Sequence, residues 1–404
     1  MNTKDELVKG SLILIILLGL FNAVNYVFHF FTARFLGPAD YAVLAVLISL
    51  IQILSIPNEA IQNVVTSYTS RLSMKKQDSK IKHLLFKSLK KGNLVALLIF
   101  LIFIPIAIFL SNFLQIDVWL LLLTGSIIFY VISISIVRGV LQGKKRFYSL
   151  GINLLLEAVL KLGIAVALVF IGWKVYGALI GIIIAGIIGF STVFLLIKDV
   201  LKAKNEKFEF KGIYDYSLPF IYTIIAITLI YNLDVIFAKR FFAPEIAGMY
   251  AIASILGKAI FFGTVAVSKA ILPLASESHE AGKKTDYLLK KALLITGLVS
   301  FTALILYLVV PKLIISILFG QQYIGVANIL FLSGLSLTFL SFSNLILIYG
   351  LSINKIKKAY FLLGFVALEV IGFSLFHSNL FEFILTYTVI NFLMLIYSIL
   401  IIRK

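Results

Sequence analysis

The chain has 404 residues, of which 61% are hydrophobic and only 13% are charged, against roughly 45–50% and 25% in soluble domains. So large an apolar fraction excludes an ordinary water-soluble globular protein and indicates a polytopic membrane protein. Lysine and arginine outnumber aspartate and glutamate 36 to 18, and the lack of cysteine excludes disulfides and thiolate metal sites.

Apolar runs along the chain predict about 12 membrane spans, because about 20 apolar residues cross the hydrocarbon core. The expected spans are 10–33, 41–70, 92–112, 116–140, 149–172, 175–197, 213–237, 246–275, 291–319, 325–350, 359–376 and 379–401. The first run follows Lys4 and Lys9 but lacks a small-residue cleavage site, so we expect a retained span rather than a signal peptide. Pro57 predicts a kink inside the long second span.

One stretch of the sequence returns at a shift of 206 residues. The two copies are FTARFLGPADYAVLAVLISL (31–50) and FAKRFFAPEIAGMYAIASIL (237–256). Identical residues align at Phe31 and Phe237, Arg34 and Arg240, Phe35 and Phe241, and Pro38 and Pro244. Each copy joins two apolar runs through a short turn with a proline, which predicts two related halves.

A second repeat follows the spans 116–140 and 325–350, where a basic loop leads to a tyrosine and then a glutamate. The matching residues are Tyr148 with Glu157 and Tyr360 with Glu369. Because an even number of spans per half keeps the orientation, the halves should be parallel repeats. The sequence therefore predicts an all-α polytopic membrane protein with two six-helix lobes, 1–205 and 206–404.

The basic residues gather at the two termini and in the loops that follow every second span. By the positive-inside rule, this pattern predicts a cytoplasmic-membrane protein with both termini in the cytoplasm. The excess of positive charge is then topological, and nucleic acid is not an expected partner. The basic segment 71–91 could contact anionic lipid headgroups or serve only as an orientation signal.

Catalytic signatures are missing from the sequence, which contains no phosphate-binding GxxxxGK[ST], no HExxH and no nucleophile elbow. The expected outer loops are only a few residues long. We therefore expect a transporter rather than an enzyme, without a cofactor, that draws energy from an ion gradient or from the gradient of its substrate.

Polar side chains inside the first two spans follow helical spacing. Asn22, Asn25 and His29 share one helical face in the first span, and Glu59, Gln62, Asn63 and Thr66 share one in the second. These stripes could line a cavity that meets a hydrophilic substrate. They could also provide interhelical hydrogen bonds, and the second could be a helix end near the headgroups.

Ionisable side chains inside the bilayer usually face a cavity or each other. Glu157 and Lys161 lie one helical turn apart, which favours a mutually neutralised pair. Glu369, the repeat partner of Glu157, has Phe373 where that lysine would be. We therefore take Glu369, with Glu157, as the candidate proton-coupling residues.

The span 246–275 contains Lys258 and Lys269, which are 11 residues apart. That separation is close to three helical turns, so both side chains should point the same way. Together with Lys161 they could form a cationic cavity that attracts phosphates. Asp234 should pair locally with Lys239 or Arg240.

Three short segments resemble motifs of a known transporter family. They are ARFLGPADYA (33–42), KRFFAPEIAGMYA (239–251) and FGQQY (319–323). They resemble the polysaccharide-export branch of the multidrug/oligosaccharidyl-lipid/polysaccharide (MOP) flippase superfamily, the O-antigen-repeat flippase type. The resemblance covers nearly the whole chain.

The resemblance implies a flippase with two lobes around a central cavity, which moves undecaprenyl-diphosphate-linked oligosaccharides by alternating access for cell-surface polysaccharide synthesis. It implies diphosphate-binding cations in the first, second and eighth spans, of which this chain has only Lys258 and Lys269. Expected partners are the lipid-linked glycan, membrane lipids and polysaccharide-assembly proteins. A drug or small-molecule exporter of the same superfamily and a membrane-embedded glycan-assembly enzyme are the alternatives.

Overall fold

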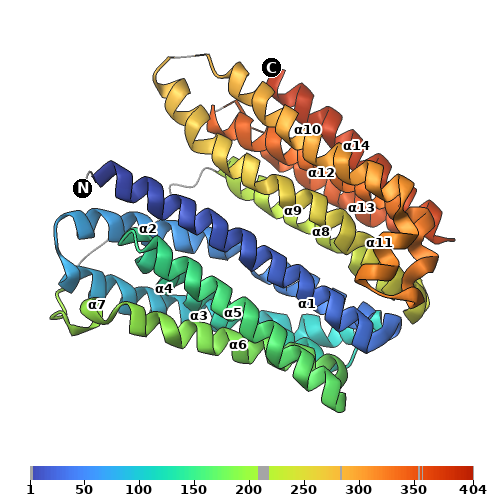
Figure 1. Cartoon of the computed structure of the whole chain (residues 1–404), viewed down its shortest axis with the longest axis horizontal. Coiled ribbons are helices and arrows are strands. Elements are labelled where there is room, and N and C mark those ends of the chain that lie inside the picture. The colour runs from blue at the N-terminus through green and yellow to red at the C-terminus, as the bar shows by residue number, and fades with distance from the viewer. Residues whose placement is uncertain (1–2, 208–217, 283, 354, 357, 404) are drawn as a thin grey trace. The chain divides into compact units, whose positions relative to one another are not determined.

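The computed structural model describes residues 3–207, 218–282, 284–353, 355–356 and 358–403, and all of its regular structure within these residues is helical (Figure 1). The α-helices are α1 (Thr3–Leu54), α2 (Pro57–Met74), α3 (Asp78–Leu114), α4 (Val118–Gly143), α5 (Phe147–Leu168), α6 (Lys174–Leu196), α7 (Lys198–Lys202), α8 (Leu218–Phe241), α9 (Pro244–Glu280), α10 (Asp286–Val309), α11 (Pro311–Leu318), α12 (Ala327–Ser352), α13 (Leu362–Leu375) and α14 (Leu380–Arg403). The expected all-α polytopic fold is confirmed.

Within the described residues, nine continuous helical stretches are long and apolar enough to cross a membrane. The stretch Phe147–Leu196 contains the expected spans 149–172 and 175–197, separated at Gly172. The stretch Ile16–Leu54 contains most of the expected span 10–33 and, after a break at Gly37, only the first part of 41–70; the rest of 41–70 belongs to α2, which is not one of the nine. The expected span 359–376 is the shorter apolar helix Ala359–Leu375. The first residues of the expected span 213–237 lie outside the described part of the chain.

Two prolines divide expected spans as their chemistry requires. Pro57 occupies the first turn of α2, and a turn at Ser55 and Ile56 separates this helix from α1, so the expected span is divided at the predicted kink. Pro311 likewise begins α11 and separates it from α10. The missing N–H of proline costs little in a first turn, where that group has no helical partner.

Contacts between residues divide the chain into two compact units. Unit 1 contains Met1–Leu36 and Leu50–Asp215, and unit 2 contains Gly37–Ser49 and Tyr216–Lys404. The division differs from the expected lobes 1–205 and 206–404 mainly at Gly37–Ser49, the part of α1 that begins at its break, which packs within unit 2.

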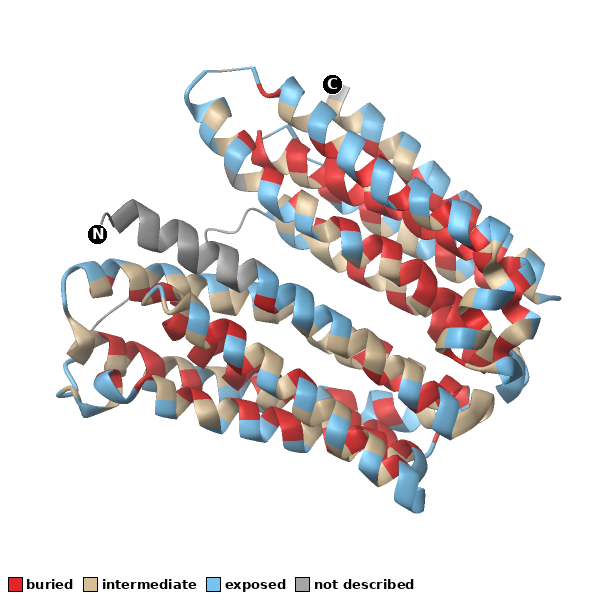
Figure 2. Cartoon of the chain, viewed as in Figure 1, coloured by how far each residue is buried: buried red, intermediate tan, exposed pale blue. Residues whose placement is uncertain are grey.

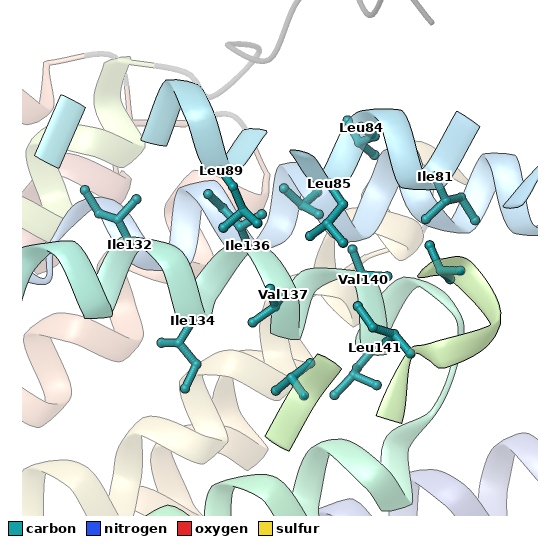
Figure 3. Close-up of a cluster of buried hydrophobic side chains, with 14 of the residues drawn as sticks. Ile81, Leu84, Leu85, Leu89, Ile132, Ile134, Ile136, Val137, Val140 and Leu141 are labelled. Atoms are coloured by element: carbon teal, nitrogen blue, oxygen red, sulfur yellow. The ribbon is translucent and has the colours of Figure 1, made fainter. Parts of the chain in front are cut away.

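Helix α4 is the core of unit 1. In its most apolar stretch 72% of the residues are buried, against 17% for α3, whose outer face remains available to lipid (Figure 2). Leu85 and Leu89 of α3 pack with Ile136 and Val140 of α4 in a cluster of buried aliphatic side chains (Figure 3). On another side of α4, a Cβ on Gly139 would lie 2.9 Å from the carbonyl oxygen of Gln62, so the missing side chain permits close approach of α2.

Helix α12 has the same position in unit 2, with 72% of its most apolar stretch buried against α9, α10 and α14 (Figure 2). Polar groups join these helices at short range. Ser333 donates to the carbonyl oxygen of Ala253 at 2.7 Å, and Asn391 donates to Ser336 at 3.0 Å. Such bonds satisfy polar groups that lipid cannot.

The repeated turn at residues 31–50 and 237–256 occurs at equivalent breaks between helices. Gly37 has φ 75° and ψ 172°, a conformation essentially limited to glycine, and Pro38 follows it. At the equivalent position Ala243 has φ −54° and ψ 149°, and Pro244 starts α9. The repeat thus keeps the proline, whereas the residue before it differs in backbone conformation.

Within unit 2, the start of the Gly37–Ser49 segment lies against α9. A Cβ placed on Gly248 would lie 1.9 Å from the carbonyl oxygen of Pro38, so only glycine fits there. Tyr41 of the same segment is fully buried and meets the ring of Tyr323 edge to face, with centroids 6.3 Å apart. The motif residues Pro38 and Tyr323 therefore contribute to the packing of unit 2.

Candidate functional site

In unit 1, α1 and α5 bring Asn25 and Lys161 together. The Lys161 ammonium donates to Asn25 Oδ1 and lies 4.6 Å from the centre of the Phe28 ring. Asn25 also donates to the carbonyl oxygen of Phe21, one turn earlier. Asn22 is exposed and His29 is half-buried on the same helix.

Glu157 does not pair with Lys161, although the two residues are one turn apart. Its carboxylate accepts instead from Arg138 of α4, at 2.5 Å, and from the hydroxyl of Tyr130. Asn153, one turn before Glu157, accepts from Arg138 Nε at 2.8 Å. Lys161 is thus left with a neutral amide, an aromatic face and no carboxylate within ion-pair distance among the described residues.

Of the four polar residues that share one face of α2, two contact α4 and two are exposed. Gln62 donates to Gln142 of α4 at 2.9 Å, and the Thr66 hydroxyl reaches the carbonyl oxygen of Gly139 at 3.3 Å. Glu59 and Asn63 are exposed. Helical spacing alone could not separate these pairs, because the close packing of α2 on α4 decides which side chains turn inward.

In unit 2, three polar side chains of α9 contact the carboxylate of Asp234 of α8. Ser254 and Tyr250 donate to its Oδ2 at 2.5 and 3.3 Å, and the Lys258 ammonium lies 3.7 Å from Oδ1. Tyr250, Ser254 and Lys258 are spaced by four residues, so they share one face of α9. The expected local pairing of Asp234 with Lys239 or Arg240 was wrong, because Asp234 is fully buried and faces α9.

Glu369 of α13 is also fully buried in unit 2. Neither of its carboxyl oxygens has a hydrogen-bond partner among the described residues, and the charges of Asp234 and Lys258 act on it. Its neighbour one turn later, Phe373, stacks on Phe383. If both carboxyl groups, Asp234 and Glu369, were ionised, the single ammonium of Lys258 would leave a net charge of −1 in this cluster. A proton on one carboxyl group would make the cluster neutral.

Lys258 and Lys269 differ in environment. Lys258 is 4% exposed and paired with Asp234, whereas Lys269, about three turns further along α9, is exposed. Sequence reasoning assigned both lysines to one cationic cavity because it missed the carboxylate that faces Lys258. It also missed the hydrogen bonds that join Arg138 to Asn153 and Glu157. The position of Arg138 near the end of an apolar span could have indicated such a buried partner. The described residues contain no group of three His, Asp or Glu side chains that could hold a metal ion.

Comparison with known proteins gives a match to a family and several structural relatives. The model of the polysaccharide biosynthesis protein family matches residues 31–328. The fold is similar to an inward-facing multidrug resistance MATE family transporter of the MOP superfamily, with a TM-score of 0.75, 13% identity and coverage of 96% of this chain and 97% of the other. A search of curated proteins gave no match.

Two further solved structures share the fold. A MOP superfamily transporter from Pyrococcus furiosus, described as having a binding pocket of reverse polarity, has a TM-score of 0.63 and 14% identity, with coverage of 98% of this chain and 94% of that one. A eukaryotic MATE transporter has a TM-score of 0.64 and 12% identity, with coverage of 98% and 96%. The family match over residues 31–328 shows that the chain belongs to the polysaccharide biosynthesis protein family.

Proposed function

We propose that the protein is a flippase that carries a lipid-linked oligosaccharide of the undecaprenyl-diphosphate type across the cytoplasmic membrane by alternating access. The family match is to polysaccharide biosynthesis proteins, and the fold is that of membrane transporters. The observation that carries the proposal is Lys161, an ammonium inside a membrane helix that faces a neutral amide and an aromatic ring. A cation in such surroundings has a strong preference for an anionic ligand.

The phosphates of the substrate would bind Lys161 of unit 1. In unit 2, the exposed Lys269 is a second candidate cation for them. Lys258 would act differently from the other two, because its charge already balances Asp234. The exposed amides and carboxylate of α1 and α2 would meet the sugars. Those residues are Asn22, Glu59 and Asn63, with Asn25 and Gln62 beside them.

Transport of a fluorescent lipid-diphosphate oligosaccharide in proteoliposomes tests the role of Lys161. We expect Lys161→Ala to reduce transport at low substrate concentration by at least about tenfold, since a charge-assisted hydrogen bond is lost. Lys161→Arg should retain most activity. Lys312→Ala, at an exposed position of α11, is the control. Equal transport by Lys161→Ala, Lys161→Arg and Lys312→Ala would refute the role of Lys161 in binding the substrate.

Energy coupling would use Glu369, with Glu157 held as a structural partner of Arg138. A carboxyl group without hydrogen bonds beside an aspartate can exchange a proton as the cluster opens to water. Transport by the native protein should then depend on a proton gradient, and Glu369→Gln should abolish that dependence. Full, gradient-dependent transport by Glu369→Gln would exclude this residue.

The second candidate function is export of organic cations. Two observations favour it: the carboxyl groups of Asp234 and Glu369 outnumber the nearby ammonium, and a structural relative is a multidrug resistance transporter. Cells that overproduce the protein should then tolerate cationic drugs better than cells that produce Glu369→Gln. Unchanged tolerance, with accumulation of a lipid-linked glycan on deletion, would favour the flippase.

A further inference from the structure

At one end of unit 1, three loop segments form a single basic surface. Lys144 pairs with Asp78 at 2.9 Å and with Asp199 at 2.6 Å, so the segments 74–80, 143–148 and 198–207 lie side by side. Arg146 also pairs with Asp199, and Lys80 pairs with Glu206. Every acidic residue of these segments is therefore already neutralised by a lysine or arginine of the same surface.

Seven further lysines of these segments are exposed, and none of them pairs with a carboxylate of the described chain. We call this set the basic rim: Lys75, Lys76, Lys145, Lys198, Lys202, Lys204 and Lys207. Two large apolar side chains, Met74 and Tyr148, are 72% and 62% exposed next to it. Uncompensated cations beside exposed apolar side chains suit the boundary between lipid headgroups and acyl chains.

Two lysines of the basic rim have a backbone conformation that favours glycine. Lys76 has φ 54° and Lys145 has φ 58°. Each follows the last turn of a helix, α2 or α4, in the left-handed position that closes the helix end. A residue with a Cβ is strained there, and glycine is the usual choice.

The internal repeat supplies the comparison for Lys76. A shift of 206 residues maps it onto Gly282, which closes α9 with φ 68°. The hydrogen bond from Lys76 N to Ser73 O, 3.0 Å, has its equivalent from Gly282 N to His279 O, 2.9 Å. The same turn is thus closed by glycine in unit 2 and by a strained, exposed lysine in unit 1.

We propose that the basic rim binds the headgroups of anionic phospholipids, such as phosphatidylglycerol, and that Lys76 and Lys145 are kept in strained positions for this contact. A lysine in place of glycine loses local stability and gains a cation at the tip of the loop. Strain of this kind is characteristic of sites with a function. The proposal does not depend on what the protein transports.

Thermal unfolding of the purified full chain in detergent, titrated with phosphatidylglycerol or phosphatidylcholine, tests the proposal. The test variant is Lys76→Gly with Lys145→Gly. We expect it to unfold at a higher temperature than the native protein without added lipid, because the strain is relieved. It should need roughly 25-fold more phosphatidylglycerol for a half-maximal shift, at about fivefold per lysine.

Two control variants separate strain from charge. Gln115→Gly relieves a left-handed residue with φ 53° at the other end of α3 and removes no charge, so its response to lipid should stay native. Lys76→Arg with Lys145→Arg keeps the charges and should keep the response. The native response should also weaken as salt is raised.

Several results would overturn the proposal. An equal shift with phosphatidylcholine would mean that only the apolar side chains act. A native phosphatidylglycerol response in the double glycine variant would reduce the basic rim to an orientation signal. A shift produced by inorganic pyrophosphate but not by phosphatidylglycerol would point to a diphosphate ligand instead of a phospholipid.

Discussion

At the residue scale, buried charges in both units are held by partners from neighbouring helices. Arg138 and Glu157 have side chains that are 10% and 20% exposed, and they meet at 2.5 Å. A buried ion pair contributes little net stability when intact, since desolvation offsets the attraction. Removing one partner is different, because the remaining charge has neither water nor a counter-ion.

We expect Arg138→Leu to destabilise the protein by about 3 kcal/mol, because it leaves the Glu157 carboxylate buried and unpaired. The double variant Arg138→Leu with Glu157→Gln should recover most of that loss. Unfolding in detergent, followed by circular dichroism with increasing denaturant, measures both. Equal losses in the single and double variants would show that the two charges are not coupled.

The sequence identified which membrane-embedded residues carry charge, but not how they pair. Four-residue spacing favoured Glu157 with Lys161, yet the carboxylate binds Arg138 of α4, whose planar guanidinium also reaches Asn153. Partners on different helices depend on packing, which spacing along one helix does not contain. Tyr250, Ser254 and Lys258 of α9 follow a regular four-residue spacing, but that spacing does not reveal their common partner, Asp234 of α8.

At the element scale, charged side chains of neighbouring segments hold the short helix α7 in place. Helix α7 has 5 residues, too few for stability on its own. Lys82 of α3 donates to the carbonyl oxygens of Leu201 and Ala203, at 2.6 and 2.9 Å. Asp199, inside α7, accepts from Arg146 and Lys144.

This arrangement predicts a pH dependence of stability. Burial acts to raise the pKa of Asp199, but hydrogen bonds from Arg146 and Lys144 outweigh it and lower the pKa from 3.8 to about 2. The stabilisation is therefore complete above about pH 4 and is lost as the pH falls toward 2. The unfolding temperature of Asp199→Asn should lie below that of the native protein at pH 6, and the two should converge near pH 2. A constant difference across this range would contradict the assignment.

The close approach at Gly248 gives a steric prediction. Gly248→Ala would place a methyl group 1.9 Å from the backbone oxygen of Pro38, which cannot rotate away as a side chain could. We expect a loss of about 3 kcal/mol, at the upper end for overpacking. Gly263→Ala, on the same helix with its nearest contact at 3.8 Å, is the matched control and should be neutral or slightly stabilising. Similar unfolding curves for both variants would argue against the contact.

At the scale of the whole molecule, hydropathy was sufficient to predict the membrane helices. Bilayer thickness fixes the length of an apolar run, so the expected spans and the repeated turns have counterparts in the described structure. Shorter elements were not predicted. Helix α11, with 8 residues, and the π-helical turn Val169–Trp173 are shorter than a span and have no hydropathy signal of their own.

The lack of cysteine makes the predicted orientation directly testable. Lys145→Cys and Trp173→Cys each introduce a unique thiol at an exposed position, at opposite ends of α5 with its π-helical turn. A membrane-impermeant maleimide should label Trp173→Cys in intact cells, and Lys145→Cys only after the cells are opened. The reverse pattern would place the basic loops outside and overturn the orientation taken from the positive-inside rule.

Because Gly37–Ser49 packs within unit 2, the two halves of the chain should not fold well when they are produced as separate fragments. A fragment that starts at residue 206 would lack the segment that covers Tyr323 and Gly248, so an apolar surface would be uncovered. The complementary fragment, 1–205, would carry that segment without the unit that buries it. The two halves of this protein, although related by an internal duplication, should therefore fold well only when both are produced in the same membrane.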